Sequence, residues 1–372
     1  MERRRFVTAT AAGGAVLGTA TALLAKPALA QTLPEVRWRM PSSFPKSLST
    51  LYGGAEYFTQ RVSVMTEGKF TITPFAAGEI VPPLQVLDAV QNGTVEAGQT
   101  APYYYVGKDP TFAFGSTVPF GFNARQQLAW ILQGGGLQLM NELTKDYNVL
   151  GFPGGNTGAQ MGGWFRKEIK TPEDIKGLKF RIAGLAGQVI AKMGGVPQQI
   201  GGGDIYPALE KGTIDAAEWV GPYDDEKLGF NKVAKYYYYP GWWEGNAQLW
   251  FYFNIEKYNA LPPAYKAVLE AACAETNAWI QTKYDAENPP ALRRLVANGA
   301  ELRPFSREIM QAAYKASFEV YDEIAAKNPR FAKVYESWKA FRADEYLWFR
   351  VAENPFENFV YAQAAAEARA KQ

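Results

Sequence analysis

Histidine is absent from this 372-residue sequence. Its absence excludes Ser-His-Asp and Cys-His catalysis, histidine-ligated zinc and the HExxH helix of metalloproteases. The single cysteine, Cys273, excludes an internal disulfide, and its alanine-rich apolar surroundings predict a small core residue. After residue 30, no stretch approaches the roughly 18 consecutive apolar residues of a membrane-spanning helix, so we expect the mature protein to be soluble.

A basic surface for nucleic acid is also missing. The formal net charge of the chain is +2, and residues 1–30 hold four basic residues and one acidic residue, so the rest carries a formal net charge of −1. The most basic short cluster, Arg293-Arg294, has the character of a solvated helix face. We therefore expect no nucleic-acid partner.

Residues 1–30 have the pattern of an export signal. Arginines 3–5 precede Phe6 and Val7, a mildly apolar run rich in Ala, Gly and Thr follows, and Ala28-Leu29-Ala30 supplies a small-x-small cleavage pattern. The paired arginines resemble a twin-arginine (Tat) signal. The alternative, a retained membrane anchor, is disfavoured because the run is short and poor in large apolar residues.

Strands and helices alternate in the remainder. Apolar periodicity predicts strands at 36–40, 70–75, 95–100 and 178–182, and helices at 51–65, 84–91 and 187–193. This alternation indicates α/β architecture with a parallel or mixed sheet. A similar helix–Gly-Thr–strand junction at Gly93 and Gly212 suggests two lobes on one plan, with a ligand cleft between them.

From residue 261 the pattern is helical. We expect helices from 263 to about 287 and at 306–327, 332–353 and 356–370. The last two present an aromatic face that is either a partner surface or packs back on the same chain. Its residues are Tyr335, Trp338, Phe341, Tyr346, Trp348, Phe349 and Phe359.

Two carboxylates and three indoles gather in the segments GTIDAAEWVGPYDDEKLG (residues 212–229) and PGWWEG (residues 240–245). Large planar apolar walls with a few charges suit a pocket for a small ionic solute, although a buried aromatic core fits the composition equally well. Glu218 and Glu244 could also be the acid/base pair of a secreted glycoside hydrolase. We interpret Asp224, Asp225 and Glu226 as solvated loop acids.

Longer motifs resemble one known family over essentially the whole chain after residue 30. They are residues 42–47 (SSFPKS), 153–160 (PGGNTGAQ), 177–182 (GLKFRI), 206–217 and 218–225 (EWVGPYDD). The chain resembles substrate-binding proteins of tripartite ATP-independent periplasmic (TRAP) transporters, of the dicarboxylate-binding type. Residues 103–109 and 236–245 resemble the branch that binds 2-oxo acids (α-keto acids) and its lactate-binding relatives.

This resemblance implies a two-lobed α/β periplasmic binding protein fold with a hinged cleft, a long lobe-spanning helix and a helical C-terminus. The implied domains are a signal peptide (1–30), lobe I (31–154 plus about 250–290), lobe II (155–249 plus about 291–330) and C-terminal helices (331–372). The resemblance also implies a periplasmic protein that delivers its ligand to the TRAP membrane permease, and a homodimer with exchanged C-terminal helices.

The same resemblance assigns the site. Arg181 occupies the position that binds the ligand carboxylate, and an arginine fork matches a carboxylate with two parallel hydrogen bonds. We expect Tyr104 to close over the ligand, since strand alternation would prevent Tyr103, Tyr104 and Tyr105 from all pointing inward. The expected substrate-binding residues are Arg181, Asn156, Gln160, Trp219, Tyr104 and Trp243.

A bridging cation is implied as well. The matching ligand positions all offer oxygen, which suits Na⁺ or Ca²⁺ and disfavours zinc or copper; they are Glu218, the Trp219 backbone carbonyl, Glu244 and Gln160. Two glutamates, one arginine and one monocarboxylate sum to a charge of −2, which a divalent ion would neutralise. The closest resemblance favours Na⁺, so Ca²⁺ remains the alternative.

These observations predict capture rather than catalysis. The protein is expected to bind a pyruvate-like 2-oxo monocarboxylate, with a calcium-dependent 2-hydroxy-acid (lactate) binder as the alternative. Two further possibilities stay open: a secreted carboxylate-pair hydrolase, and a receptor that presents its solute to a signalling partner.

Overall fold

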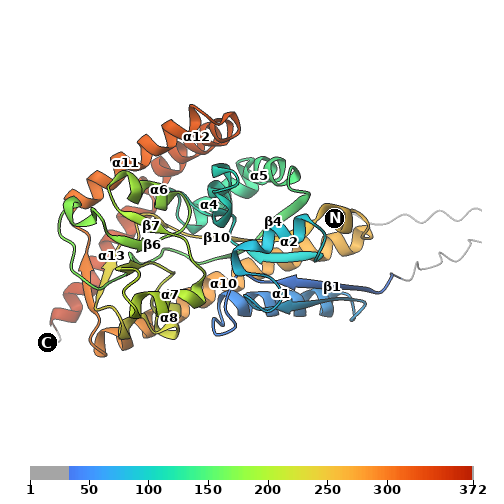
Figure 1. Cartoon of the computed structure of the whole chain (residues 1–372), viewed down its shortest axis with the longest axis horizontal. Coiled ribbons are helices and arrows are strands. Elements are labelled where there is room, and N and C mark those ends of the chain that lie inside the picture. The colour runs from blue at the N-terminus through green and yellow to red at the C-terminus, as the bar shows by residue number, and fades with distance from the viewer. Residues whose placement is uncertain (1–32, 371–372) are drawn as a thin grey trace, which may run out of the picture. The chain divides into compact units, whose positions relative to one another are not determined.

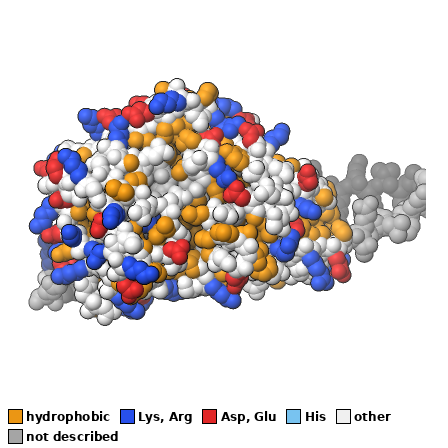
Figure 2. Space-filling view, in the orientation of Figure 1, with side chains coloured by type: hydrophobic (Ala, Val, Ile, Leu, Met, Phe, Trp, Pro, Cys, Tyr) orange, Lys and Arg blue, Asp and Glu red, His pale blue; other side chains and the backbone are white. Residues whose placement is uncertain are grey.

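The computed structural model describes residues 33–370, and the chain from Pro34 onward forms one compact unit. The expected signal peptide lies outside the described residues. The described part is mixed α/β, which confirms the predicted fold class. Among residues 33–370, no helix combines the length and hydrophobicity that crossing a bilayer requires. On the face drawn in Figure 2, positive and negative side chains are interspersed.

We call the part built on β1–β4 and β10 lobe I. β1 and β2 pair in parallel, while β10 lies between β3 and β4 and is antiparallel to both. A bridge between Ser42 and Gln99 links the two sheets. The strands are β1 (Val36–Pro41), β2 (Phe70–Phe75), β3 (Ala97–Thr100), β4 (Val149–Asn156) and β10 (Gln248–Asn254). The helices are α1 (Leu51–Met65), η1 (Pro83–Gln85), α2 (Val86–Gln91), η2 (Pro102–Tyr105), η3 (Pro110–Phe112), α3 (Ala113–Ser116), α4 (Ala124–Gln133), α5 (Gly136–Lys145) and α9 (Ile255–Asn259).

Lobe II contains the six-stranded mixed sheet in the order β11-β9-β5-β8-β6-β7. Figure 1 shows β6, β7, α6 and α7 grouped apart from the blue β1 and α1 of lobe I. The strands are β5 (Trp164–Phe165), β6 (Lys179–Arg181), β7 (Val196–Gln198), β8 (Ala216–Ala217), β9 (Tyr236–Tyr239) and β11 (Glu301–Pro304). The helices are η4 (Pro172–Ile175), α6 (Gly184–Lys192), α7 (Gly202–Glu210), α8 (Pro222–Leu228), η5 (Phe230–Lys232) and α11 (Arg307–Ala325).

The chain crosses between the lobes at residues 157–163, at residues 240–247 and within a long helix. These crossings lie within a few residues of the expected boundaries at 154/155 and 249/250, which we keep as the proposed lobe boundaries. The crossing segments 157–163 and 240–247 run next to each other, because Gly241 donates its N–H to the carbonyl oxygen of Gln160 at 3.1 Å. A Cβ on Gly241 would stand 2.7 Å from that oxygen, so only glycine permits the approach.

The long helix is α10 (Pro263–Ala297), which packs on α1 and β4 of lobe I and on α8 of lobe II. Our prediction that it ends near residue 287 was wrong, because it continues through Pro289 and Pro290. Each proline removes a backbone hydrogen bond, and packing on α8 compensates for the loss. The Asn288 side chain contributes there by accepting a hydrogen bond from the Tyr223 N–H at 3.1 Å.

The C-terminal helices are α12 (Pro329–Val351) and α13 (Glu353–Ala370), and the predicted aromatic face on them has a buried part and an exposed part. Tyr335 and Trp338 are buried, with ring centroids 6.2 and 5.9 Å from that of Phe114. Trp348 and Phe359 are 58% and 64% exposed. Tyr335 and Trp338 therefore pack back on the chain, and Tyr346 also contacts it through hydrogen bonds to the Phe120 and Gly121 carbonyl oxygens, whereas Trp348 and Phe359 do not pack back.

Asp224 and Asp225 are fully buried, so our interpretation of them as solvated acids was wrong. Asp224 accepts hydrogen bonds from Thr50 of lobe I and Tyr284 of α10, both at 2.6 Å. Asp225 accepts from Tyr237 at 2.7 Å and from Trp164 Nε1 at 3.0 Å. Thr50, Tyr284 and Trp164 lie 60 or more residues away in sequence, which is why local polarity misled the prediction. Burial raises the pKa of Asp224 to about 6 and that of Asp225 to about 7.

These raised pKa values predict a pH-dependent stability. The folded protein retains protons that the unfolded chain releases above about pH 4, so the free energy of unfolding contributed by Asp224 and Asp225 falls as pH rises to about 7. Urea unfolding across this range should show a smaller decline for Asp225→Asn than for the wild type. The exposed Asp204→Asn is the control. An equal decline in all three proteins would contradict the prediction.

Candidate functional site: a cavity between the lobes with a buried carboxylate pair

A small cavity with a volume of about 10 Å³ lies where the lobes meet. Lobe I contributes most of its apolar wall, lobe II contributes an indole, and the crossing segments contribute polar groups. The lining residues are Phe44, Leu51, Tyr103, Tyr104, Thr157, Gln160, Trp219, Val220, Ala247 and Leu249. Arg181, Glu218 and Glu244 lie beside this lining rather than in it, next to Tyr103, Tyr104 and Trp219.

Backbone hydrogen bonds hold the segments of the site together. The Gln160 N–H donates to the carbonyl oxygen of Glu244 at 3.1 Å, and the Met161 N–H donates to that of Val220 at 3.0 Å. The Glu218 N–H donates to the carbonyl oxygen of Arg181 at 3.1 Å. The expected oxygen ligands therefore come from three separate segments that the backbone itself fixes side by side.

Arg181 ends strand β6 and is buried, with 1% of its surface exposed. Its Nη1 forms an ion pair with Glu218 Oε1 and donates to the Glu218 carbonyl oxygen at 2.8 Å, while Nε donates to the Ile200 carbonyl at 3.2 Å. The guanidinium carbon lies 5.0 Å from the ring centroid of Trp219. Burial by itself lowers the pKa of Arg181, but Glu218, Tyr104, Tyr103 and Glu244 together outweigh it and the pKa is raised.

Glu218 and Glu244 form a buried carboxylate pair with a single guanidinium beside it. Burial raises the pKa of Glu218, opposed by Arg181 and by the Ala183 N–H, which donates to Oε1 at 3.2 Å. Burial raises the pKa of Glu244 well above its ordinary value, and the charge of Glu218 raises it further. At full ionisation the site holds one negative charge more than it can pair internally.

Four buried oxygen atoms of this site make no hydrogen bond within the described part of the chain. They are Glu218 Oε2, Glu244 Oε1, Glu244 Oε2 and Gln160 Oε1. Native proteins rarely bury unpartnered oxygens, and hard cations such as Na⁺ and Ca²⁺ take just such ligands. Since residues 33–370 contain no group of three or more His, Cys, Asp or Glu side chains placed for a metal, amide and backbone oxygens must complete the set. The expected ligands Glu218, Glu244, Gln160 and the Trp219 carbonyl fit this requirement.

The tyrosine triplet adopts a different structure from the predicted one. Residues 102–105 form the 3₁₀ helix η2 instead of a strand, because Pro102 begins a helical turn, and all three tyrosines are buried. Tyr103 and Tyr104 both line the cavity. Tyr105 turns away, where its hydroxyl lies 2.8 Å from Thr100 Oγ1 and accepts from the Leu87 N–H at 3.1 Å.

Two expected substrate contacts lie elsewhere. The Asn156 amide donates to Asn246 Oδ1 at 2.9 Å and Gln248 Oε1 at 3.0 Å and accepts from the Gly158 N–H at 2.9 Å, so the protein already uses it. Trp243 packs in lobe II, with its ring centroid 5.4 Å from Phe180 and 5.6 Å from Phe305. Neither residue is among the cavity lining, and we propose a positioning role for Asn156.

Several lining residues were not predicted from the sequence. Phe44 and Thr157 lie inside motifs that it singled out, so a hydroxyl three residues before Gln160 was a usable signal. Leu51, Ala247 and Leu249 gave no signal, because only the packing of the lobes separates a cavity-lining aliphatic residue from a core one.

Comparison with known proteins gives this geometry its context. Residues 42–328 match the DctP family, described as bacterial extracellular solute-binding protein, family 7. The chain belongs to this family. Its members are receptors that bind solutes for TRAP transporters, not enzymes, so the carboxylate-pair hydrolase is set aside. Delivery of the solute to the membrane permease is their general role.

One relative and two solved structures are particularly similar to this member of the DctP family. A monocarboxylate 2-oxoacid-binding periplasmic protein of Nostoc is 54% identical over 96% of this chain and 98% of its own length. A TRAP solute-binding protein from Bordetella bronchiseptica, solved with calcium and picolinate, has a TM-score of 0.89 at 54% identity, covering 90% of this chain and 99% of its own. One from Pseudoalteromonas atlantica, with sodium and pyruvate, has a TM-score of 0.85 at 38% identity, covering 87% and 99%.

The Glu244 carboxylate, which has no hydrogen-bond partner in the described chain, leads us to predict an unusual effect on protein stability. In metal-free protein, Glu244→Gln removes a buried acid that has no internal partner, so the free energy of unfolding should rise by about 1 kcal/mol or more. Added Ca²⁺ should stabilise the wild type strongly and the variant little. Urea unfolding after chelation and again with Ca²⁺ measures both effects. The exposed Glu210→Gln should behave like the wild type. A variant that is less stable without metal, or equally stabilised by Ca²⁺, would contradict this reasoning.

Proposed function

We propose that this chain binds a short 2-oxo monocarboxylate such as pyruvate, together with a cation, and delivers it in the periplasm to the membrane subunits of a TRAP transporter. The observation that carries the proposal is the group of unpartnered buried oxygens on Glu218, Glu244 and Gln160 beside the single guanidinium of Arg181. The 2-oxoacid-binding relative at 54% identity supports the ligand class, and its periplasmic location supports the compartment.

The charges of the site favour a ligand with one carboxylate over a ligand with two. The cavity lining contains no lysine or arginine, and Arg181 is the one guanidinium beside it among the described residues. Its hydrogen bonds to the described residues use Nε and Nη1, which leaves Nη2 for a ligand carboxylate, and the Tyr104 side chain lies beside the guanidinium. The opposite wall is aliphatic and aromatic, with Phe44, Leu51 and Leu249, and would accept a short acyl chain.

The cation would neutralise the surplus carboxylate and bridge protein to ligand. Two glutamates, one arginine and one bound monocarboxylate leave a charge of −2, which Ca²⁺ cancels and Na⁺ halves. The similar structures contain calcium in one case and sodium in the other, so both ions stay in the proposal. A calcium-dependent 2-hydroxy-acid binder is the alternative, and competition between lactate and pyruvate distinguishes the two.

Ligand binding would favour closure of the lobes. Tyr104, Phe44 and Leu51 approach the cavity from lobe I, and Trp219 approaches it from lobe II beside Arg181. A ligand that contacts both sets of residues gains all its contacts only when the lobes are together, so it shifts the population towards the closed state. The permease would then recognise that closed, loaded form.

Arg181 provides the direct test. Arg181→Lys keeps the positive charge but loses the planar guanidinium that binds Glu218 and Ile200 while leaving Nη2 for the ligand, and Arg181→Ala also leaves Glu218 unpaired. We expect Arg181→Ala to lose about 3–5 kcal/mol of binding energy, more than a hundredfold in affinity, and Arg181→Lys to be intermediate.

Calorimetric titration of pyruvate in the presence of Na⁺ or Ca²⁺ measures these losses. The exposed Arg293→Ala serves as the control, and circular dichroism checks that each variant folds. A loss below fivefold in folded Arg181→Ala would remove Arg181 from the site. The absence of wild-type affinity for any short keto or hydroxy acid, in either salt, would overturn the proposed function.

We propose further that a second copy of this chain covers helix α13. This 18-residue helix has no buried residue, and an isolated helix of that length gains little stability in water. Large apolar side chains are exposed along it and at the end of α12: Leu347, Trp348, Val351, Phe356, Phe359 and Tyr361, at 58–67%. The similar Bordetella bronchiseptica protein is described as a dimer, which supports this occupant.

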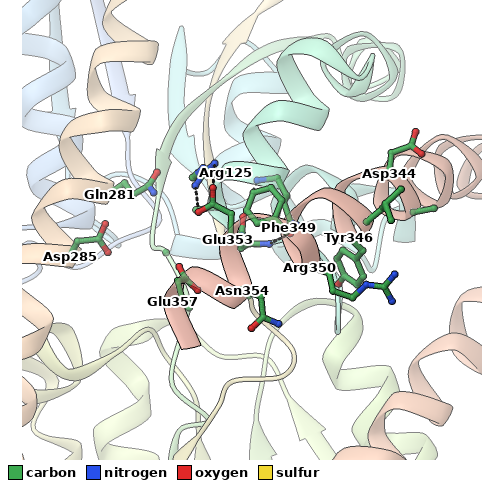
Figure 3. A pocket seen from close by; sticks show the side chains of 18 residues that line it. Arg125, Gln281, Asp285, Asp344, Tyr346, Phe349, Arg350, Glu353, Asn354 and Glu357 are labelled. Atoms are coloured by element: carbon green, nitrogen blue, oxygen red, sulfur yellow. Dashed lines mark hydrogen bonds and ion pairs between the residues drawn. The ribbon is translucent and has the colours of Figure 1, made fainter. Parts of the chain in front are cut away.

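The start of α13 also lines a groove of about 1000 Å³. Figure 3 shows Glu353 held by Arg125, with an Nη1–Oε2 distance of 3.0 Å, while Gln281 and Asp285 of α10 stand across the groove from Glu357. The hydrogen bonds and the ion pair between α13 and the rest of the described chain come from Glu353 in its first turn, while Phe356, Phe359 and Tyr361 are exposed.

The double variant Phe356→Glu/Phe359→Glu tests the second copy. Two charges on the exposed face should convert a dimer into a monomer in light-scattering chromatography, because burying them unpaired is costly. Val64→Glu/Ile80→Glu, at exposed apolar positions elsewhere, is the matched control and should stay dimeric. A wild type that is monomeric at micromolar concentration, or a dimer indifferent to the α13 charges, would contradict the proposal.

A further inference from the structure

Thr157 lies in the first crossing segment, three residues before Gln160, and its hydroxyl is fully occupied. The hydroxyl donates to the Gly158 carbonyl oxygen at 2.9 Å. It accepts from the Ala247 N–H at 3.0 Å and from Gln160 Nε2 at 3.1 Å. A hydroxyl has one proton and two lone pairs, so these three bonds exhaust its capacity.

This arrangement determines which way the Gln160 amide faces. Because the only proton of the Thr157 hydroxyl is given to Gly158, the group can only accept from Gln160, which must present its NH₂ to Thr157. The amide oxygen is then turned away from Thr157, and Gln160 Oε1 is one of the buried oxygens without a hydrogen bond in the described chain. Turning the amide over would place two unprotonated oxygens in contact and direct NH₂ protons to where Oε1 now lies.

Thr157 is itself held in place by the second crossing segment. Its N–H donates to the carbonyl oxygen of Ala247 at 3.2 Å, and the Ala247 N–H returns a bond to the hydroxyl. Thr157 is 2% exposed and Gln160 is 5% exposed, so water does not compete for these bonds. The orientation of one amide is thus coupled to the contact between the two segments that join the lobes.

We propose that Thr157 is a positioning residue that orients the Gln160 amide oxygen towards the cation held by Glu218 and Glu244. The inference rests on the cation site of the proposed function. A glutamine with free choice of orientation would offer NH₂ as readily as oxygen, and an NH₂ group repels a cation. Thr157 therefore acts on cation affinity through Gln160.

The test compares Thr157→Val, which keeps the shape and removes the hydroxyl, with Thr157→Ser, which keeps the hydroxyl. Calorimetric titration with Ca²⁺ alone, without any organic acid, is the readout. We expect Thr157→Val to weaken Ca²⁺ binding about tenfold or more, and Thr157→Ser to stay within about threefold of the wild type. Thr276→Val, at a buried threonine whose hydroxyl donates to the Ala272 carbonyl of its own helix, is the matched control and should leave affinity unchanged.

A second pair of variants separates positioning from a general structural effect. In a Gln160→Ala background, Thr157→Val should cause no further loss of Ca²⁺ affinity, because the group through which it acts is gone. If the Val variant fails to fold, Thr157→Ala is used in the same cycle.

If the wild type binds Ca²⁺ and folded Thr157→Val binds it equally well, this inference is overturned while the proposed function stands. A loss that persists in the Gln160→Ala background would also overturn it. A wild type that binds neither Ca²⁺ nor Na⁺, with or without pyruvate, would overturn the cation site and this inference together.

Discussion

The pairing of two buried carboxylates with one guanidinium is the interaction on which this site depends. Glu218 pairs with Arg181, while Glu244 keeps both oxygens unpartnered in an environment that raises its pKa. Such an arrangement costs stability unless a cation or a proton compensates the charge. In the proposed function a cation supplies this compensation, so the cation and the ligand carboxylate are expected to favour each other's binding.

The scaffold holds this unfavourable arrangement by rigid local geometry. Backbone hydrogen bonds join residues 160–161 to Val220 and Glu244, and Gly241 permits a contact that any side chain would prevent. The site therefore lies where the chain passes between lobes, rather than on either lobe alone. In the proposed closure of the lobes, segments so placed would keep the polar groups in register, since both crossing segments are bonded to each other.

The buried acids outside the cavity differ from Glu244 in that their carboxylate oxygens have hydrogen-bond donors. Asp224 and Asp225 have raised pKa values from burial, yet hydroxyl and indole donors satisfy their oxygens. Glu244 has the same burial without such donors. A raised pKa alone thus does not separate a structural acid from a functional one, whereas the presence or absence of partners does.

Local sequence patterns were sufficient for much of the fold. The helix at Leu51–Met65 and the strand at Phe70–Phe75 have their predicted bounds, because apolar periodicity and flanking turns are local properties. The resemblance of long motifs led to the family, and with it to Arg181 and to an oxygen ligand set from Glu218, Glu244 and Gln160. Only the tertiary structure decided that α10 continues through Pro289, that Asp224 is buried between lobes, and that Tyr103 joins Tyr104 at the cavity while Trp243 does not. The reason is physical: burial, hydrogen-bond saturation and the direction of a side chain depend on residues far away in the chain, and no local pattern records them.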